Sequence, residues 1–165
     1  MRKLRHLKPG ATYHVTSQID HGDWALQEAA IKQMFLDMVM IAKKKFQFKL
    51  WNFMIMDNHI HFLIKPGDGV SLSKIMQWLK CNFAKKWNKL HDRTGHLWGE
   101  RFFSEIIEDE SHLEVVSAYI DRNPVKANLV WQASDWQFGG LFHWLNGIKG
   151  VIDTWLEADF IACPG

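Results

Sequence analysis

Cysteine is scarce in this sequence. The two cysteines, Cys81 and Cys163, lie far apart, and neither belongs to a Cys-x-x-Cys pair. Their spacing argues against a fold held together by disulfides and against a zinc site built from thiolates. A reducing compartment is therefore expected.

Long apolar runs are missing as well. No stretch of about 18 consecutive apolar residues occurs, and the basic residues 1–10 contain no apolar signal core. The sequence also lacks internal repeats, low-complexity tracts and interdomain linkers. With 165 residues, of which 47% are hydrophobic and 23% charged, the chain is expected to form one soluble cytoplasmic domain with a real core.

Charge is unevenly divided along the chain. Residues 1–101 contain 17 Lys and Arg against 8 Asp and Glu, a net charge of +9, whereas residues 102–165 contain 3 against 10, a net charge of −7. This division favours a basic region that faces a polyanion and an acidic region that does not touch it. Two ordinary solvated surfaces are the alternative.

The hydrophobic patterns predict the order strand, helix, strand, strand, helix, strand, helix. The expected strands cover residues 11–19, 46–56 and 59–65, and residues 96–107 are expected to form an extended segment or strand. The expected helices cover residues 27–46, 72–91 and 111–123. A capping box at Ser111 begins the last helix and Pro124 ends it. The first six elements match an α+β, ferredoxin-like βαββαβ core, an antiparallel sheet with helices on one face. The last helix is an addition to this core.

Two further predictions concern the helix faces and the end of the chain. Apolar spacing predicts which side chains of the two long helices are buried. In the first helix they are Ile31, Met34, Phe35, Met38, Ile41 and Ala42, and Lys32 lies outside this stripe. In the second helix they are Ile75, Leu79, Phe83, Trp87 and Leu90. Residues 131–165 form an aromatic appendage packed on the main domain of residues 1–130, with Trp131, Trp136, Trp144 and Trp155.

His59 and His61 begin the third predicted strand, directly after an Asp-Asn turn. Because side chains alternate along a strand, both imidazoles project from one side, while Ile60 and Phe62 project from the other. Two imidazoles with this spacing can hold one metal ion. Two hydrogen-bonded histidines without a metal are the alternative.

The last predicted helix places Tyr119 and Asn123 on one face, one turn apart. Taken alone, the helix favours a half-buried core tyrosine. If this face meets the histidine pair, however, His59, His61 and the Asn123 side-chain oxygen make three ligands and leave positions for water and phosphate oxygens. Such a mixed nitrogen and oxygen shell suits Mg²⁺ or Mn²⁺ in phosphate chemistry and can also hold zinc.

Basic side chains on and after the second helix are candidates for contacts with a DNA backbone. They are Lys74, Lys80, Lys85, Lys86, Lys89 and Arg101. His14, on the polar face of the first strand, is a further candidate. A solvated lysine face and a hydrogen-bonded structural histidine are the alternatives.

Several motifs, in the same order, resemble a known family. The His59-Ile60-His61 stretch resembles the His-hydrophobe-His motif of HUH single-strand nucleases, and residues 119–127 (YIDRNPVKA) are similar to the tyrosine helix of their single-tyrosine, IS200-like transposase branch. Further stretches resemble the subgroup associated with repetitive extragenic palindromes (REP), namely 13–17 (YHVTS), 57–61 (DNHIH), 95–98 (GHLW), Arg101-Phe102 and 135–147. The resemblance extends from about Pro9 to Ile161.

The resemblance implies a metal-dependent single-strand DNA endonuclease and strand transferase that acts on hairpin or palindromic DNA in the nucleoid. Tyr119 would be the nucleophile, leaving a 5′-phosphotyrosyl link and a free 3′-hydroxyl. His59, His61 and Asn123 would hold Mg²⁺ or Mn²⁺. The family allows either a monomer or a homodimer with exchanged tyrosine helices.

Two departures and two alternatives accompany the resemblance. Gln18-Ile19-Asp20 stands where the family often has Arg-Gly-Asn, and Gly99-Glu100 differs from the usual uncharged pair before Arg101. A replication initiator or relaxase shares the histidine pair but usually has a different tyrosine context. A non-catalytic regulator that binds hairpin DNA on the same fold is the other alternative.

Overall fold

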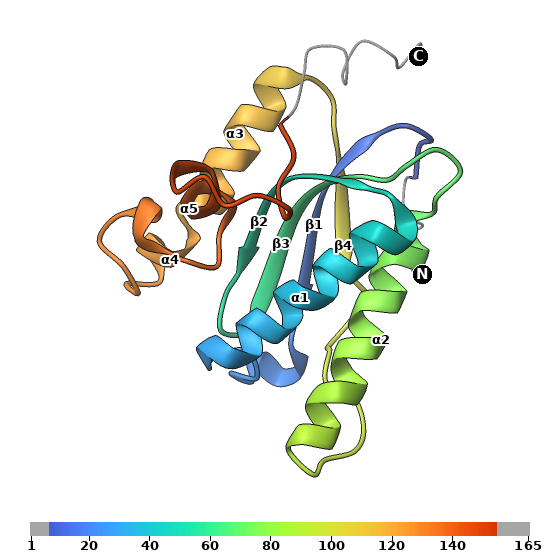
Figure 1. Cartoon of the computed structure of the whole chain (residues 1–165), viewed down its shortest axis with the longest axis vertical. Coiled ribbons are helices and arrows are strands. Elements are labelled where there is room, and N and C mark those ends of the chain that lie inside the picture. Colours follow the sequence, from blue (N-terminus) through green and yellow to red (C-terminus); the bar gives the residue numbers. More distant parts are fainter. Residues whose placement is uncertain (1–6, 155–165) are drawn as a thin grey trace.

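The computed structural model describes residues 7–154, in which an antiparallel sheet carries helices on both faces (Figure 1). The strands are β1 (Thr12–Gln18), β2 (Lys49–Ile55), β3 (His59–Lys65) and β4 (Phe103–Ile107). The helices are α1 (Ala29–Phe46), α2 (Leu72–Leu90), α3 (Glu110–Asp121), α4 (Asn123–Lys126) and α5 (Gly140–Leu145), with 3-10 turns at Asp20–Gly22 and Ala133–Asp135.

The strand order is β2-β3-β1-β4, and every neighbouring pair is antiparallel. β1 and β2 are therefore parallel to each other with β3 between them, and α1 connects them. In the same way α2 connects β3 to β4 across β1. These two interleaved βαβ units confirm the predicted α+β, ferredoxin-like fold.

Alternation along the strands supplies apolar side chains to both faces of the sheet. On one face Phe62 of β3 packs with Phe35 of α1 and Phe83 of α2, and the rings of Phe35 and Phe62 stack with centroids 6.2 Å apart. On the other face Leu63 packs with Ile120 of α3 in a smaller core. The predicted additional helix thus covers the face from which the histidine pair projects.

The extended segment or strand predicted over residues 96–107 forms a strand only in its last part. Only β4 (Phe103–Ile107) pairs with β1, and the preceding segment follows the end of β1 through hydrogen bonds from Asp20 N to Leu97 O (2.9 Å) and from Gly99 N to Gln18 O (3.0 Å). Trp98 and Phe102 are buried in the core. Their apolar character is typical of a strand, but in this structure the two side chains hold a loop against the core.

The predicted N-terminal cap of the last helix is wrong, whereas its end is as predicted. Asp109 caps α3 by accepting a hydrogen bond from His112 N at 2.7 Å, so the cap is not Ser111. A carboxylate also interacts favourably with the positive end of the helix dipole. α3 ends before Pro124 as predicted, but the proline then lies in the first turn of α4. Backbone N–H groups in a first turn have no acceptor within the helix, so the missing N–H of proline costs no hydrogen bond there.

The predicted buried faces of α1 and α2 are wrong at three positions. Ile41 and Leu90 are 54% and 63% exposed; Ile41 lies off the observed stripe, and Leu90 ends α2 where this helix runs past the sheet (Figure 1). Lys32, in contrast, is only 2% exposed. It lies three residues before Phe35 on the buried face of α1, and its Nζ donates to Asp57 Oδ1 at 2.6 Å. The carboxylate compensates for the burial of the ammonium.

The aromatic segment after α4 packs against β2. Ile55 N donates to Phe138 O at 2.9 Å, and Trp136 Nε1 donates to Ile55 O at 3.1 Å. Gly140 lies so close to the Asn52 side chain that a Cβ atom would clash with it. Trp155 lies outside the described residues, and the boundary at residue 130 stays a prediction. Between residues 7 and 154, none of the helices has the length and apolar character needed to cross a bilayer.

Candidate functional site

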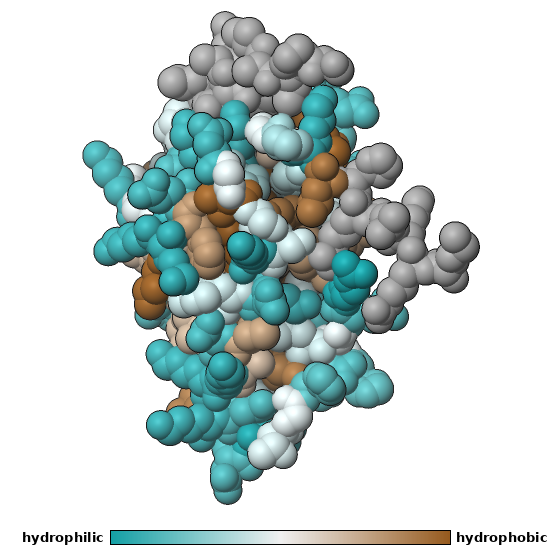
Figure 2. Space-filling model, turned by 90° about the vertical axis from the view of Figure 1, so that its right-hand side faces the viewer, coloured by the Kyte–Doolittle hydropathy of each residue, from teal (hydrophilic) through white to brown (hydrophobic). Residues whose placement is uncertain are grey.

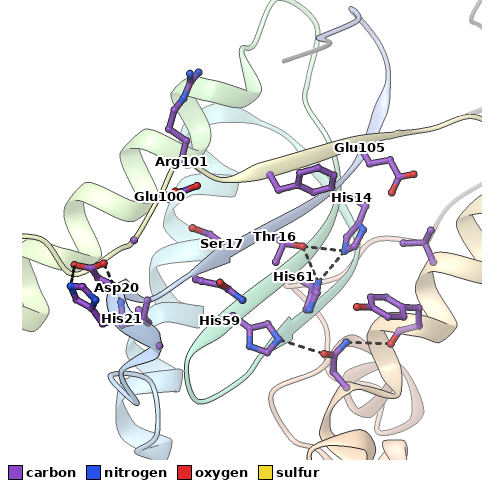
Figure 3. A pocket seen from close by; sticks show the side chains of 18 of the residues that line it. His14, Thr16, Ser17, Asp20, His21, His59, His61, Glu100, Arg101 and Glu105 are labelled. Atoms are coloured by element: carbon purple, nitrogen blue, oxygen red, sulfur yellow. Dashed lines mark hydrogen bonds and ion pairs between the residues drawn. The ribbon is translucent and has the colours of Figure 1, made fainter. Parts of the chain in front are cut away.

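A pocket of about 1030 Å³ lies over the α3 face of the sheet, between β1, β3, α3 and residues 99–101 (Figure 3). Six of the predicted site residues line it: His14, His59, His61, Arg101, Tyr119 and Asn123. They come from β1, β3, the loop before β4, α3 and α4. The fold therefore brings together residues that are far apart in the sequence.

His59 and His61 project from β3 into this pocket, as the strand alternation predicts. Their ring centroids are 5.0 Å apart and the rings are nearly perpendicular, at 81°. His59 Nδ1 lies 2.8 Å from Asn58 Oδ1, and His61 Nδ1 lies 3.0 Å from His14 Nε2. His61 Nε2 is buried and has no hydrogen-bond partner among residues 7–154.

Asn123 directs its side-chain oxygen toward the histidines. Its Nδ2 donates to the carbonyl oxygens of Tyr119 and Ile120 at 3.2 and 3.3 Å, so its Oδ1 is the atom that faces His59 Nε2 at 3.4 Å. The break between α3 and α4 places the residue here, because Asn123 begins the new helix.

Burial lowers the pKa of both histidines of β3 and so favours their neutral forms. Desolvation lowers the pKa of His59, against which a hydrogen bond to Asn123 acts. The pKa of His61 is lowered to about 3, chiefly by burial and then by the neighbouring His59 and His14. A neutral imidazole offers a lone pair, which is the form that binds metals.

The donor set fits a small divalent cation. Within residues 7–154, His61 Nε2 is a buried nitrogen without a hydrogen-bond partner, and His59 Nε2 and Asn123 Oδ1 face each other beside it. Nowhere in residues 7–154 do three or more His, Cys, Asp or Glu side chains form a metal cluster. The amide oxygen of Asn123 is a donor of the type that Mg²⁺ accepts, so it could complete the histidine pair.

Tyr119 is 47% exposed at the side of the pocket. Its ring centroid lies 6.0 Å from that of His61 and 6.2 Å from that of His14. Lys126 of α4 places its Nζ over the ring of Tyr119, 4.8 Å from the ring centroid. The other tyrosine of the chain, Tyr13, is 3% exposed, and its hydroxyl donates to Lys8 O at 2.8 Å.

The predicted DNA-contacting residues fall in three places. Lys74, Lys85, Lys86 and Lys89 are exposed on α2, and Lys80 donates to Glu100 O at 3.1 Å; none of the five lines the pocket. Hydrophilic side chains predominate on the lower part of the face that carries α2 (Figure 2). Arg101 lines the pocket but points away from the histidines (Figure 3). His14 lies on its floor and is 7% exposed.

Four residues around the site escaped the sequence analysis. Asn58 and Thr16 bond to the histidines, Lys126 covers Tyr119, and Glu105 faces His14 across the β1–β4 pair. The Asp-Asn turn before the histidines and the Lys in the tyrosine motif were visible in the sequence. The pairing of Glu105 with His14 depends on strand register and left no local signal.

The chain is similar to known proteins in sequence and in fold. A family model described as "Transposase IS200 like" matches residues 9–123. The fold is similar to that of a REP-associated tyrosine transposase solved with a REP hairpin, with a TM-score of 0.73, 21% identity, and coverage of 98% of this chain and 96% of that one. It is also similar to a protein described as a transposase of Deinococcus radiodurans R1, with a TM-score of 0.51, 16% identity, and coverage of 74% and 97%. No curated protein matches the sequence. Since the family model matches well over half of the chain, the chain belongs to the IS200-like transposase family.

Proposed function

We propose that this transposase is a metal-dependent single-strand DNA endonuclease and strand transferase that cuts hairpin or palindromic DNA through a 5′-phosphotyrosine intermediate. The observation that carries the proposal is the meeting of Tyr119 with His59, His61 and Asn123 in one pocket. The nucleophile and the three proposed ligands then surround a space open to a DNA phosphate.

Tyr119 is the proposed nucleophile because it is the exposed tyrosine of the two in the chain. Its Oη forms a bond to the scissile phosphorus, and the bond from phosphorus to the 3′-oxygen breaks. The phenol proton passes to water, and the departing 3′-oxygen takes up a proton. Attack by a 3′-hydroxyl on the phosphotyrosine reverses these steps, so strands are rejoined without ATP.

His59, His61 and Asn123 are the proposed ligands of a Mg²⁺ or Mn²⁺ ion. When bound, the ion neutralises the charge of the phosphate and helps to orient it for in-line attack. The neutral histidines supply lone pairs, and the Asn123 amide is held by two carbonyl groups of α3. The ligands are therefore fixed before the substrate arrives.

We propose a hairpin as substrate for two reasons. The related fold was solved with a REP hairpin, and this chain has a basic first part with exposed lysines on α2. Phosphate contacts of this kind supply affinity that does not depend on base sequence.

Tyr119 is proposed to act on DNA bound to its own chain. Asn52 of β2 donates from Nδ2 to Ser117 Oγ at 2.8 Å and to Asp121 Oδ1 at 2.9 Å, which ties α3 to the sheet that carries the histidines. A monomer suffices for this arrangement. A homodimer with exchanged helices would need these contacts to form between chains.

The test uses a set of labelled hairpin oligonucleotides with Mn²⁺ or Mg²⁺. The wild-type protein should give a denaturant-resistant protein–DNA adduct and a shorter strand with a free 3′-hydroxyl. Tyr119→Phe should bind the same oligonucleotides without an adduct. Binding without an adduct by the wild type, across hairpin and linear substrates, would favour a non-catalytic regulator.

A further inference from the structure

The two nitrogens of the His61 ring have different surroundings. Nδ1 lies 3.0 Å from His14 Nε2 and 3.2 Å from Thr16 Oγ1. Nε2 is buried and lacks a partner among residues 7–154. One side of the ring is therefore held by the protein, and the other side faces the pocket.

This asymmetry selects one tautomer of His61. Each neutral imidazole carries one N–H proton, and a hydrogen bond between two ring nitrogens uses one such proton. If His14 donated from Nε2, His61 would carry its proton on Nε2, where a buried N–H would have no acceptor in hydrogen-bond geometry among residues 7–154; the Asn123 side chain lies near enough to act on the pKa of His61 but makes no such bond. If His61 donates from Nδ1, Nε2 carries a lone pair instead. Only the second arrangement allows His61 to bind a cation.

His14 is placed to enforce the second arrangement. It is 7% exposed, and its ring stacks on that of His61 with centroids 5.2 Å apart and an interplanar angle of 16°. Thr16, two residues on, lies on the same side of β1, but its hydroxyl is farther from His61 Nδ1 than His14 Nε2 is. His14 is thus the principal partner.

His59 repeats the pattern with a different partner. Its Nδ1 lies 2.8 Å from Asn58 Oδ1, an atom that can only accept, so His59 Nδ1 carries the proton and donates. Its Nε2 then carries the lone pair and faces Asn123 Oδ1 across 3.4 Å; both atoms are acceptors, so no hydrogen bond joins them in this tautomer. Both histidines of β3 therefore have Nδ1 held and Nε2 directed inward.

We propose that His14 is a positioning residue of the cation site: it accepts the Nδ1–H of His61 and so keeps the Nε2 lone pair directed into the pocket. Buried partners of this kind fix the ring orientation and raise the basicity of a metal-ligating histidine. The proposal rests on the proposed function of His61 as a ligand. It replaces the predicted role of His14 as a DNA contact.

The experiment measures Mn²⁺ binding to the metal-free protein, without DNA, by calorimetry and by the EPR signal of free Mn²⁺. His14→Leu removes the acceptor, and Mn²⁺ affinity should fall by about 10- to 100-fold. His14→Gln keeps an acceptor oxygen and should recover most of the affinity. His96→Leu, at an exposed histidine outside the pocket, is the matched control and should bind as the wild type does.

Equal affinity in His14→Leu and the wild type would overturn the inference, and so would equal losses in His14→Leu and His14→Gln, which would indicate packing alone. A wild-type protein that binds no Mn²⁺ would overturn the proposed metal site together with the inference. Circular dichroism and thermal melting establish that each variant is folded.

A second measurement needs no variant. In ¹⁵N-labelled metal-free protein, long-range ¹H–¹⁵N correlations assign which ring nitrogen carries the proton. The expected result is Nδ1–H for His61 and for His59. A proton on His61 Nε2 would overturn the proposed direction of the His61–His14 hydrogen bond.

Discussion

Exposure divides the residues of the pocket into two groups. Tyr119 is 47% exposed, whereas His61 and His14 are 4% and 7% exposed. A nucleophile has to meet a phosphate that arrives from solvent, and the ligands of a cation benefit from a fixed position. The burial of these three side chains thus matches their proposed tasks, whereas His59 and Asn123 are half-buried.

The first prediction at this scale concerns the ligand histidines. His59→Ala and His61→Ala should each lower the rate of adduct formation by at least about 100-fold, because each removes one ligand from the ion that neutralises the phosphate. Hairpin affinity in filter binding should stay within about threefold of the wild type, since phosphate contacts elsewhere dominate it. Retained cleavage in both variants would reject the metal site.

The second prediction concerns Lys126, whose ammonium lies 4.8 Å from the centroid of the Tyr119 ring. An exposed cation–π contact contributes about 0.5–1 kcal/mol, and this cation also attracts the phosphate that Tyr119 attacks. Lys126→Gln should therefore slow single-turnover adduct formation by about 2- to 5-fold, while Lys126→Arg should keep most of the rate. Unchanged kinetics in Lys126→Gln would show that the contact is incidental.

Among the secondary-structure elements, α1 is locked to the turn before β3 by the buried pair of Lys32 and Asp57. Removing one partner of a buried ion pair leaves an uncompensated charge and costs about 3–5 kcal/mol. Lys32→Met should lower the free energy of unfolding by about this amount in urea denaturation. Lys44→Met, at an exposed lysine of the same helix, should change it by less than about 0.5 kcal/mol.

A double variant separates charge from packing at this position. Lys32→Met combined with Asp57→Asn removes both charges, so part of the stability lost in Lys32→Met should return. A double variant less stable than Lys32→Met would contradict this account of the turn.

Element type was more predictable from the sequence than element limits. Long periodic segments such as α1 and α2 have many residues that agree on one pattern, so their bounds were close. β4 was overestimated because apolar Trp98 and Phe102 pack a loop onto the core. Lys32 was misplaced because its partner, Asp57, is brought to it only by the fold. Local patterns do not contain this information.

For the whole molecule, the division of charge predicts how binding depends on salt. If the exposed lysines of α2 lie along the phosphate backbone, hairpin affinity should fall linearly with the logarithm of salt concentration. Each lost contact reduces the slope by about 0.7–0.9, so Lys85→Gln combined with Lys86→Gln should reduce it by about 1.5. Lys149→Gln, in the acidic part of the chain, should leave the slope unchanged. A flat salt response in the wild type would count against the basic surface.

Acid stability is a second property of the whole molecule. Burial lowers the pKa of His143 on α5, against which a backbone hydrogen bond at Gln137 acts. As pH falls below about 6.5, the unfolded chain takes up a proton here before the folded chain does. The free energy of unfolding should therefore decrease, by at most about 1.4 kcal/mol per pH unit from this residue.

His143→Gln tests that relation. In urea denaturation between neutral pH and about pH 5, this variant should lose less stability with falling pH than the wild type does. His96→Gln, at an exposed histidine, should follow the wild-type curve. An unchanged pH dependence in His143→Gln would contradict the assignment, whatever the variant's absolute stability.

The functional site was predictable to the extent that its residues carry motifs. The spacing of His59 and His61 and the face shared by Tyr119 and Asn123 followed from strand and helix geometry. Their meeting in one pocket, and the position of His14 against His61, depend on which strands are neighbours and on the face that α3 covers. These are long-range relations that one sequence does not display.

If DNA is attached through a tyrosine as proposed, the burial of Tyr13 limits how many DNA ends one chain can hold. With its hydroxyl committed to Lys8, the chain has a single tyrosine available for covalent attachment, so one protein molecule can carry one 5′ end at a time. Excising a segment with two ends then requires either two protein molecules or two successive reactions by one. The mass of the covalent complex gives the number of protein molecules in it, which would distinguish two successive reactions by one molecule from the joint action of two molecules.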